Sequence, residues 1–78
     1  MRWTIRMHRL AMQSLYQIER GEAATVSAAI RSLERIPRPP GSDPVPEQAN
    51  VFTMNAAGHT IAYELWESER VVIILQIG

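Results

Sequence analysis

The chain has 78 residues, contains no cysteine, and balances eight acidic residues with eight basic residues, all of them arginine. A core of this size supplies only about 3–5 kcal/mol of stability, and without cysteine neither a disulfide nor a thiolate metal site can add to it. The neutral balance argues against a nucleic-acid-binding module, and the longest apolar run, Val71 to Leu75, is far shorter than the roughly 20 residues that span a membrane.

The N-terminal segment predicts a short strand that leads into a helix. An alternating run places three apolar side chains on one face of the strand, namely Trp3, Ile5 and Met7. The apolar period then becomes helical, with one stripe formed by Ala11, Leu15 and Ile18. His8 lies at the junction, where a local hydrogen bond is expected to hold it. We expect Gly21 to end the helix in a positive-φ conformation.

A second helix is predicted immediately after Gly21. Its apolar stripe consists of Val26, Ile30 and Leu33, widened by Ala29 and Ile36. Pro37 ends this helix, because the residue before a proline is displaced from the helical region. Such a short connection predicts an antiparallel helical hairpin whose two stripes pack on one face of a sheet.

The segment from Pro37 to Asn50 contains five prolines and a glycine, which predicts a stiff irregular connector. A strand with Phe52 and Met54 on one face follows it, and Gly58 is expected to form a tight turn by adopting positive φ.

The C-terminal stretch predicts two strands joined by the turn Glu67 to Arg70. In the first strand, one face carries Ile61, Tyr63 and Leu65, while the other carries Thr60, Ala62, Glu64 and Trp66. The second strand is apolar almost without interruption, as in a strand that is buried on both faces or paired on both sides. The whole chain, residues 1–78, is therefore predicted to be one α+β domain. Its order is β-α-α-β-β-β, with a helical hairpin on a mainly antiparallel four-stranded sheet.

These residues, in this order, resemble the RelE/ParE superfamily of small bacterial toxins from type II toxin–antitoxin systems. The second helix ends like the family pattern I..L...P at Ile30, Leu33 and Pro37. The family's Gly turn and "YR(I/L)xYE" strand correspond here to Gly58-His59-Thr60-Ile61-Ala62-Tyr63-Glu64. The final run from Val72 is similar to the family's "VVxVLxVGxR" and stops at its glycine, Gly78.

The resemblance implies a toxin that binds an antitoxin polypeptide. Ribonuclease members act on messenger RNA in the ribosome, and related members inhibit DNA gyrase. The family places basic residues on the strand that here carries Val51, Thr53 and Asn55, and an arginine where this chain has Thr60. It places further catalytic residues beyond the position of Gly78. None of these positions matches, so only the scaffold positions transfer, namely Gly58, Ile61, Tyr63 and Glu64.

His59 is the one weak catalytic candidate, because a histidine titrates near neutral pH and lies beside the turn at the family's cleft. The simpler interpretation is a solvent-facing histidine at a strand end, since no carboxylate or arginine lies beside it in the sequence. Glu64, Glu67 and Glu69 are interpreted as solvated charges around a turn. No metal-ligand spacing, phosphate-binding loop or cysteine nucleophile is present in the sequence, so no cofactor or metal is predicted.

Three residues are predicted to contact a partner. Trp66 is an interface candidate because aromatic side chains dominate such contacts, and Arg31 and Arg35 are spaced along the predicted second helix. The first hypothesis is therefore a catalytically degenerate toxin-like protein that an antitoxin covers along the sheet face and helices. The second is an active ribosome-dependent endoribonuclease or gyrase inhibitor, and the third is a structural homo-oligomer that pairs through a free strand edge. A cytoplasmic location is the default expectation, because no secretory signal is apparent.

Overall fold

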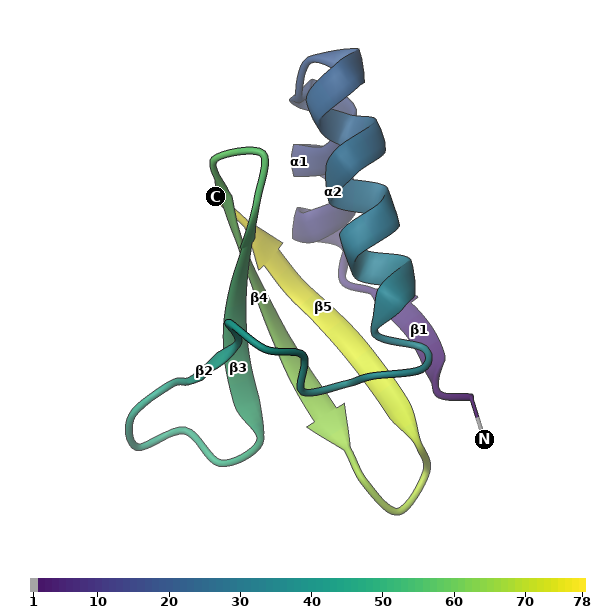
Figure 1. The fold of residues 1–78 in the computed structure, drawn as a ribbon, viewed down its shortest axis with the longest axis vertical. Helices are drawn as coiled ribbons and strands as arrows, with labels where there is room; N and C mark the ends of the chain where they lie inside the picture. Colours follow the sequence, from purple (N-terminus) through teal and green to yellow (C-terminus); the bar gives the residue numbers. More distant parts are fainter. Residues whose placement is uncertain (1) are drawn as a thin grey trace.

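The computed structural model describes residues 2–78 and shows two helices packed against one face of a five-stranded sheet (Figure 1). In chain order the elements are β1 (Thr4–Met7), α1 (Arg9–Gln17), α2 (Arg20–Ser32), β2 (Asp43–Pro44), β3 (Val51–Ala56), β4 (His59–Trp66) and β5 (Val71–Ile77). The predicted α+β class and the two-helix hairpin over the sheet are confirmed. The predicted number of four strands is one too low.

The additional strand, β2, lies within the proline-rich connector and is only two residues long. It pairs Asp43 with Thr53 and Pro44 with Phe52 at the edge of the sheet. Proline lacks an N–H group and is tolerated at such an edge. A strand this short leaves no alternation in the sequence, which is why the connector was predicted to be irregular.

The sheet has the strand order β1-β5-β4-β3-β2, so β5 lies between β1 and β4. β1 pairs with β5 in parallel, and the other neighbours are antiparallel. β1 and β5 can pair in parallel because the connection between them is long, includes the helical hairpin, and lets the chain return to the same end of the sheet. Pairing on both sides explains the nearly unbroken apolar sequence of β5.

The first helix ends earlier than predicted. α1 stops at Gln17, and the carboxylate of Glu19 accepts hydrogen bonds from the backbone N–H groups of Gly21 at 2.7 Å and Glu22 at 3.3 Å. Glu19 is thus the N-cap of α2, and Gly21 lies in the first turn of that helix, without positive φ. The prediction for Gly21 is wrong because this cap starts a new helix before the glycine. A Cβ at residue 21 would lie 3.0 Å from Glu19 Oε1, so glycine makes room for the cap.

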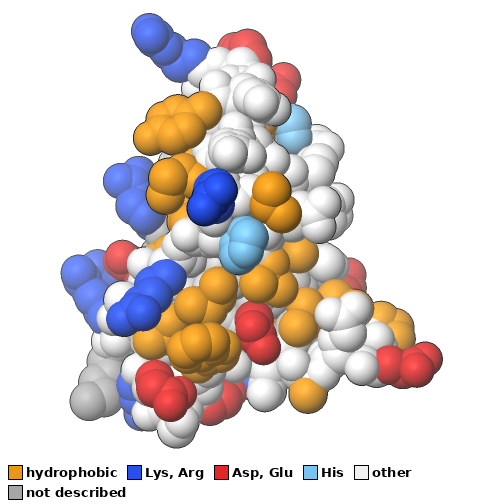
Figure 2. All heavy atoms as spheres, turned by 180° about the vertical axis from the view of Figure 1, so that it is seen from behind, with side chains coloured by type: hydrophobic (Ala, Val, Ile, Leu, Met, Phe, Trp, Pro, Cys, Tyr) orange, Lys and Arg blue, Asp and Glu red, His pale blue; other side chains and the backbone are white. Residues whose placement is uncertain are grey.

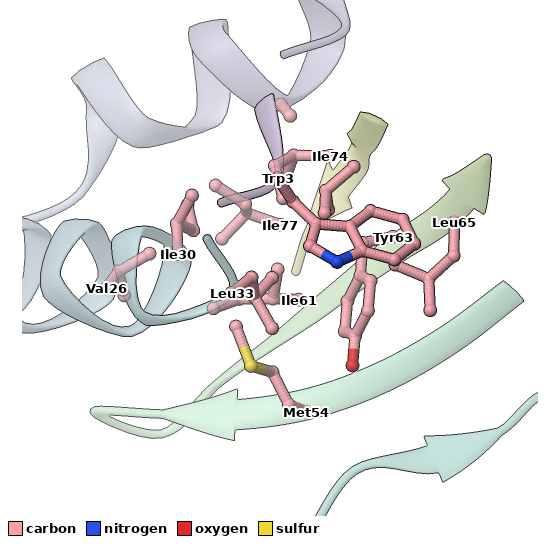
Figure 3. Packing of buried hydrophobic residues seen from close by; sticks show 12 residues of the cluster. Trp3, Val26, Ile30, Leu33, Met54, Ile61, Tyr63, Leu65, Ile74 and Ile77 are labelled. Atoms are coloured by element: carbon pink, nitrogen blue, oxygen red, sulfur yellow. The ribbon is translucent and has the colours of Figure 1, made fainter. Parts of the chain in front are cut away.

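The core lies between the helices and the sheet and is formed by α1, α2, β3, β4 and β5, with a contribution from Trp3 (Figure 3). The predicted stripe residues of α2 are buried, namely Val26, Ile30 and Leu33, and so are Ile61, Tyr63 and Leu65 of β4. Ile36, which was predicted to widen the stripe, is instead 56% exposed. It lies beyond the end of α2 at Ser32, so the helical period no longer applies to it.

The β3–β4 hairpin turns on two residues, and both adopt positive φ, at 52° for Ala57 and 80° for Gly58. The prediction for Gly58 is confirmed. Alanine is unusual in this conformation, because its Cβ approaches the following carbonyl oxygen. Within residues 2–78, neither helix is long and apolar enough to cross a membrane.

Candidate functional site

The sheet has one face toward the helices and one face toward solvent, which we call the outer face. Since side chains alternate along a strand and Ile61, Tyr63 and Leu65 point into the core, the neighbouring side chains of β4 point outward. Near the Gly78 end of β5, the outer face contains a shallow cavity of about 240 Å³. Four residues line it: Thr60, Ala62, Gln76 and Gly78.

Of the positions at which the resemblance leads us to expect basic residues, Thr60 lines this cavity, and Thr53 and Asn55 pair with residues that line it. On β3, Thr53 pairs with Ala62, and Asn55 pairs with Thr60. The hydroxyl of Thr60 donates a hydrogen bond to Asn55 Oδ1 at 3.0 Å, so these two polar side chains satisfy each other. Val51, the third position, is buried.

None of the side chains that line the cavity is charged or titrates near neutral pH. The cavity can therefore exchange hydrogen bonds with a small polar group, but it supplies neither a cation to stabilise a phosphate nor a group to transfer a proton.

His59, the catalytic candidate, lies at the first position of β4 and points toward α2 instead of into the cavity. Its Nε2 lies 2.7 Å from Glu22 Oε1, and its Nδ1 lies 3.2 Å from the carbonyl oxygen of Gly78. The side chain is 24% exposed. The interpretation as a solvent-facing histidine without a carboxylate partner is thus incomplete, because Glu22 approaches from the other layer of the fold.

Both partners of His59 accept hydrogen bonds, and only the imidazolium form can donate to both at once. The hydrogen bond to Glu22 accordingly raises the pKa of His59 above its ordinary value of 6.5, although partial burial opposes the shift. This arrangement connects β4, β5 and α2. A catalytic role for His59 stays a prediction.

His8 holds the position predicted for it at the junction of β1 and α1. Its Nδ1 accepts a hydrogen bond from the backbone N–H of Leu10 at 3.1 Å, so the side chain caps the helix. In the described part of the chain, no group of three histidine, cysteine or acidic side chains is placed to hold a metal ion.

Arg38, two residues of the sheet and one residue of the β4–β5 turn form a cluster that the sequence did not predict. Arg38 forms an ion pair with Glu67, and its guanidinium lies 5.3 Å from the centre of the Phe52 ring. Phe52 stacks on Tyr63 with 5.9 Å between ring centres, and the Tyr63 hydroxyl donates to the carbonyl of Pro37 at 2.9 Å. Burial raises the pKa of Tyr63. The cluster fixes the proline-rich connector on the sheet, so Glu67 is more than a solvated turn charge.

The three predicted partner contacts lie in different layers of the molecule. Trp66 is 44% exposed on the outer face at the end of β4, whereas Arg31 and Arg35 are exposed on α2 and the turn after it. The structure therefore does not gather them in one site.

Sequence reasoning missed the exposed apolar side chains of α1, namely Leu10, Met12 and Tyr16, with Tyr16 82% exposed. The sequence does contain a signal for it, since all three residues fall off the buried stripe of the helix.

Comparison with known proteins shows that the fold of the chain is similar to solved RelE structures, at low sequence identity. No protein-family model matches it, and neither does any curated protein. A chain of the RelBE2 toxin–antitoxin complex from Mycobacterium tuberculosis is similar with a TM-score of 0.86 and 20% identity, covering 99% of this chain and 90% of that one. The isolated RelE toxin of E. coli gives 0.85 and 10%, covering 97% and 82%.

A third similar structure is the archaeal RelE–RelB complex from Pyrococcus horikoshii. One of its chains gives a TM-score of 0.82 at 15% identity, covering 99% of this chain and 93% of that one. The chain therefore has a RelE-like fold, as the resemblance in its sequence indicated.

Proposed function

We propose that this protein is the toxin-like component of a toxin–antitoxin pair, that it binds an antitoxin polypeptide in the cytoplasm, and that it does not cleave RNA. The observation that carries the proposal is a RelE-like fold whose outer face has an uncharged cavity. Among the solved structures with this fold, one similar chain comes from a toxin–antitoxin complex and another from a RelE–RelB complex.

The lack of cleavage follows from the chemistry of phosphodiester transfer. The reaction needs cations near the phosphate, a group that activates the attacking hydroxyl, and an acid for the leaving oxygen. The side chains of Thr60 and Gln76 at the cavity supply none of these at neutral pH. The ring of His59, the catalytic candidate, is directed to Glu22 on the other side of the sheet.

The exposed surface of α1 is the surface on which we place the antitoxin. Met12 and Tyr16 lie one helical turn apart and form an apolar strip. α1 contains no acidic residue, and the exposed Arg9 and Arg20 lie at and just beyond its two ends. Such a surface is complementary to an amphipathic segment with acidic side chains beside its apolar ones. Arg31 and Arg35 remain predicted contacts at the far end of α2.

The test is co-purification with the product of any small reading frame that adjoins the gene, followed by measurement of the affinity. The double substitution Met12→Glu and Tyr16→Glu should weaken the complex at least tenfold. Ile36→Glu is the matched control, since Ile36 is also exposed but lies outside α1. A complex that the α1 variant leaves unchanged contradicts this placement, and the absence of any complex contradicts the proposal itself.

A further inference from the structure

The outer face has a regular arrangement of side chains that its strand register defines. In one row, β5 places Ile73 between Arg6 of β1 and Glu64 of β4. In the next row, Val71 lies between Thr4 of β1 and Trp66 of β4. The middle of the face is therefore apolar, while a positive and a negative side chain lie on either side of Ile73.

Neither charge in the first row has a partner inside the described chain. The ion pairs among residues 2–78 join Arg38 to Glu67 and His59 to Glu22, and they include neither Arg6 nor Glu64. Since adjacent strands lie about 4.8 Å apart, the backbones of Arg6 and Glu64 are about 10 Å from each other, on either side of β5. Their charges are thus available for a surface that presents the opposite order.

We propose that the outer face is an interface on which a second copy of this chain packs, sheet against sheet. A two-fold axis that runs parallel to β5 above Ile73 exchanges the two sides of that strand. It places Arg6 of one copy over Glu64 of the other, and Glu64 over Arg6, while the two Ile73 side chains meet at the axis. An isologous contact requires this reciprocity, and paired sheets pack about 10 Å apart with nearly aligned strands.

The second row fits the same arrangement. The axis brings Trp66 over Thr4 of the other copy and thereby covers an aromatic side chain that is 44% exposed in the single chain. Seen from behind, the molecule shows hydrophobic side chains gathered over its lower half, with arginines along one margin and acidic side chains among and below them (Figure 2).

Nucleic acid is a poor occupant of the outer face, because the row of Arg6, Ile73 and Glu64 has one charge of each sign instead of an excess of positive charge.

Charge exchange tests the proposal on the intact chain. Sedimentation equilibrium should show a concentration-dependent dimer. Arg6→Glu alone and Glu64→Arg alone should each weaken it at least tenfold, or by about 1.4 kcal/mol, because each opposes like charges at two symmetric positions. The double variant R6E/E64R restores opposite charges and should recover the dimer. Ala24→Glu is the control, since Ala24 is exposed on α2, which lies against the opposite face of the sheet.

Circular dichroism verifies that each variant is folded. A wild-type chain that stays monomeric at its highest soluble concentration overturns the proposal. A dimer that the single variants leave intact, or that the double variant does not restore, also overturns it, because the contact then involves another surface. Hydrogen exchange provides a further test. If the chain is monomeric and its outer face becomes protected only when a partner polypeptide binds, the face belongs to that partner, and self-association is refuted.

Discussion

The turn between β3 and β4 offers a direct test of the local structure beside the cavity. Ala57 adopts φ of 52° and Gly58 adopts φ of 80°, which together form a two-residue turn that favours Asn-Gly or Gly-Gly. A non-glycine residue in this region costs about 1–2 kcal/mol. Glycine removes that strain, while its greater freedom in the unfolded chain costs about 0.5–1 kcal/mol. Ala57→Gly should therefore stabilise the fold by about 0.5–1 kcal/mol.

The gain is measurable because the domain is small. For a chain of this size, about 1 kcal/mol shifts Tm by about 4–8 °C, so thermal and urea unfolding of Ala57→Gly should both show increased stability. Ala57→Asn is a second variant, since asparagine keeps a Cβ but tolerates positive φ. The matched control is Ala28→Gly in the exposed middle of α2, where the same substitution should cost about 1 kcal/mol. If Ala57→Gly destabilises the protein as Ala28→Gly does, the described turn is wrong.

Three further predictions follow from the contacts between layers. His59 has a higher pKa in the folded state than its ordinary 6.5, so its contribution to stability is complete below pH 6.5 and lost as pH rises through the folded pKa. The titration of its ring by NMR should show this shift, and Glu22→Gln should reduce it; a folded pKa below 6.5 would contradict the described contact. Tyr63→Phe removes the hydrogen bond to the Pro37 carbonyl and should cost about 0.5–1.5 kcal/mol. It should also accelerate amide exchange at Ser42 in the connector, and unchanged exchange would exclude a role for the hydroxyl in fixing this segment. Leu33→Ala removes a fully buried side chain and should cost about 2–5 kcal/mol in urea unfolding, whereas a cost near zero would show that Leu33 lies outside the core.

The sequence predicts the parts of the fold that depend on periodicity. Alternation along β4 identifies Ile61, Tyr63 and Leu65 as core residues, and the helical period of α2 identifies Val26 and Ile30. Both patterns arise from burial of one face of one element. These patterns can be recognised without knowing which element packs against the buried face, so the sequence alone predicts them.

The errors arise where a contact between neighbouring residues competes with a stronger sequence signal. Gly21 has the usual identity of a helix C-terminal residue, but the carboxylate of Glu19 caps a new helix there. Glutamate is not among the residues preferred at an N-cap, so the local sequence favoured the wrong helix boundary. Ile36 fits the period of α2, but the helix ends at Ser32.

The contacts around the candidate site leave no local signal. His59 and Glu22 are 37 positions apart, and Arg38 and Glu67 are 29 positions apart. Such pairs depend on how α2 and the connector lie on the sheet, which periodicity does not determine. The uncharged side chains of the cavity on the outer face, in contrast, could be predicted, because the residues at those positions are known from the sequence once the register of the strands is assumed.

Cleavage of messenger RNA on translating ribosomes is the measurement that tests most directly whether this RelE-like fold lacks nuclease chemistry. The purified protein is added to a translation extract, and the ends of a defined message are mapped by primer extension. We expect the same pattern as in buffer alone, because the cavity around Thr60 and Gln76 supplies neither a cation nor a proton-transfer group. New cleavage sites that appear with the wild-type protein and disappear with His59→Ala would contradict this account and assign catalysis to His59.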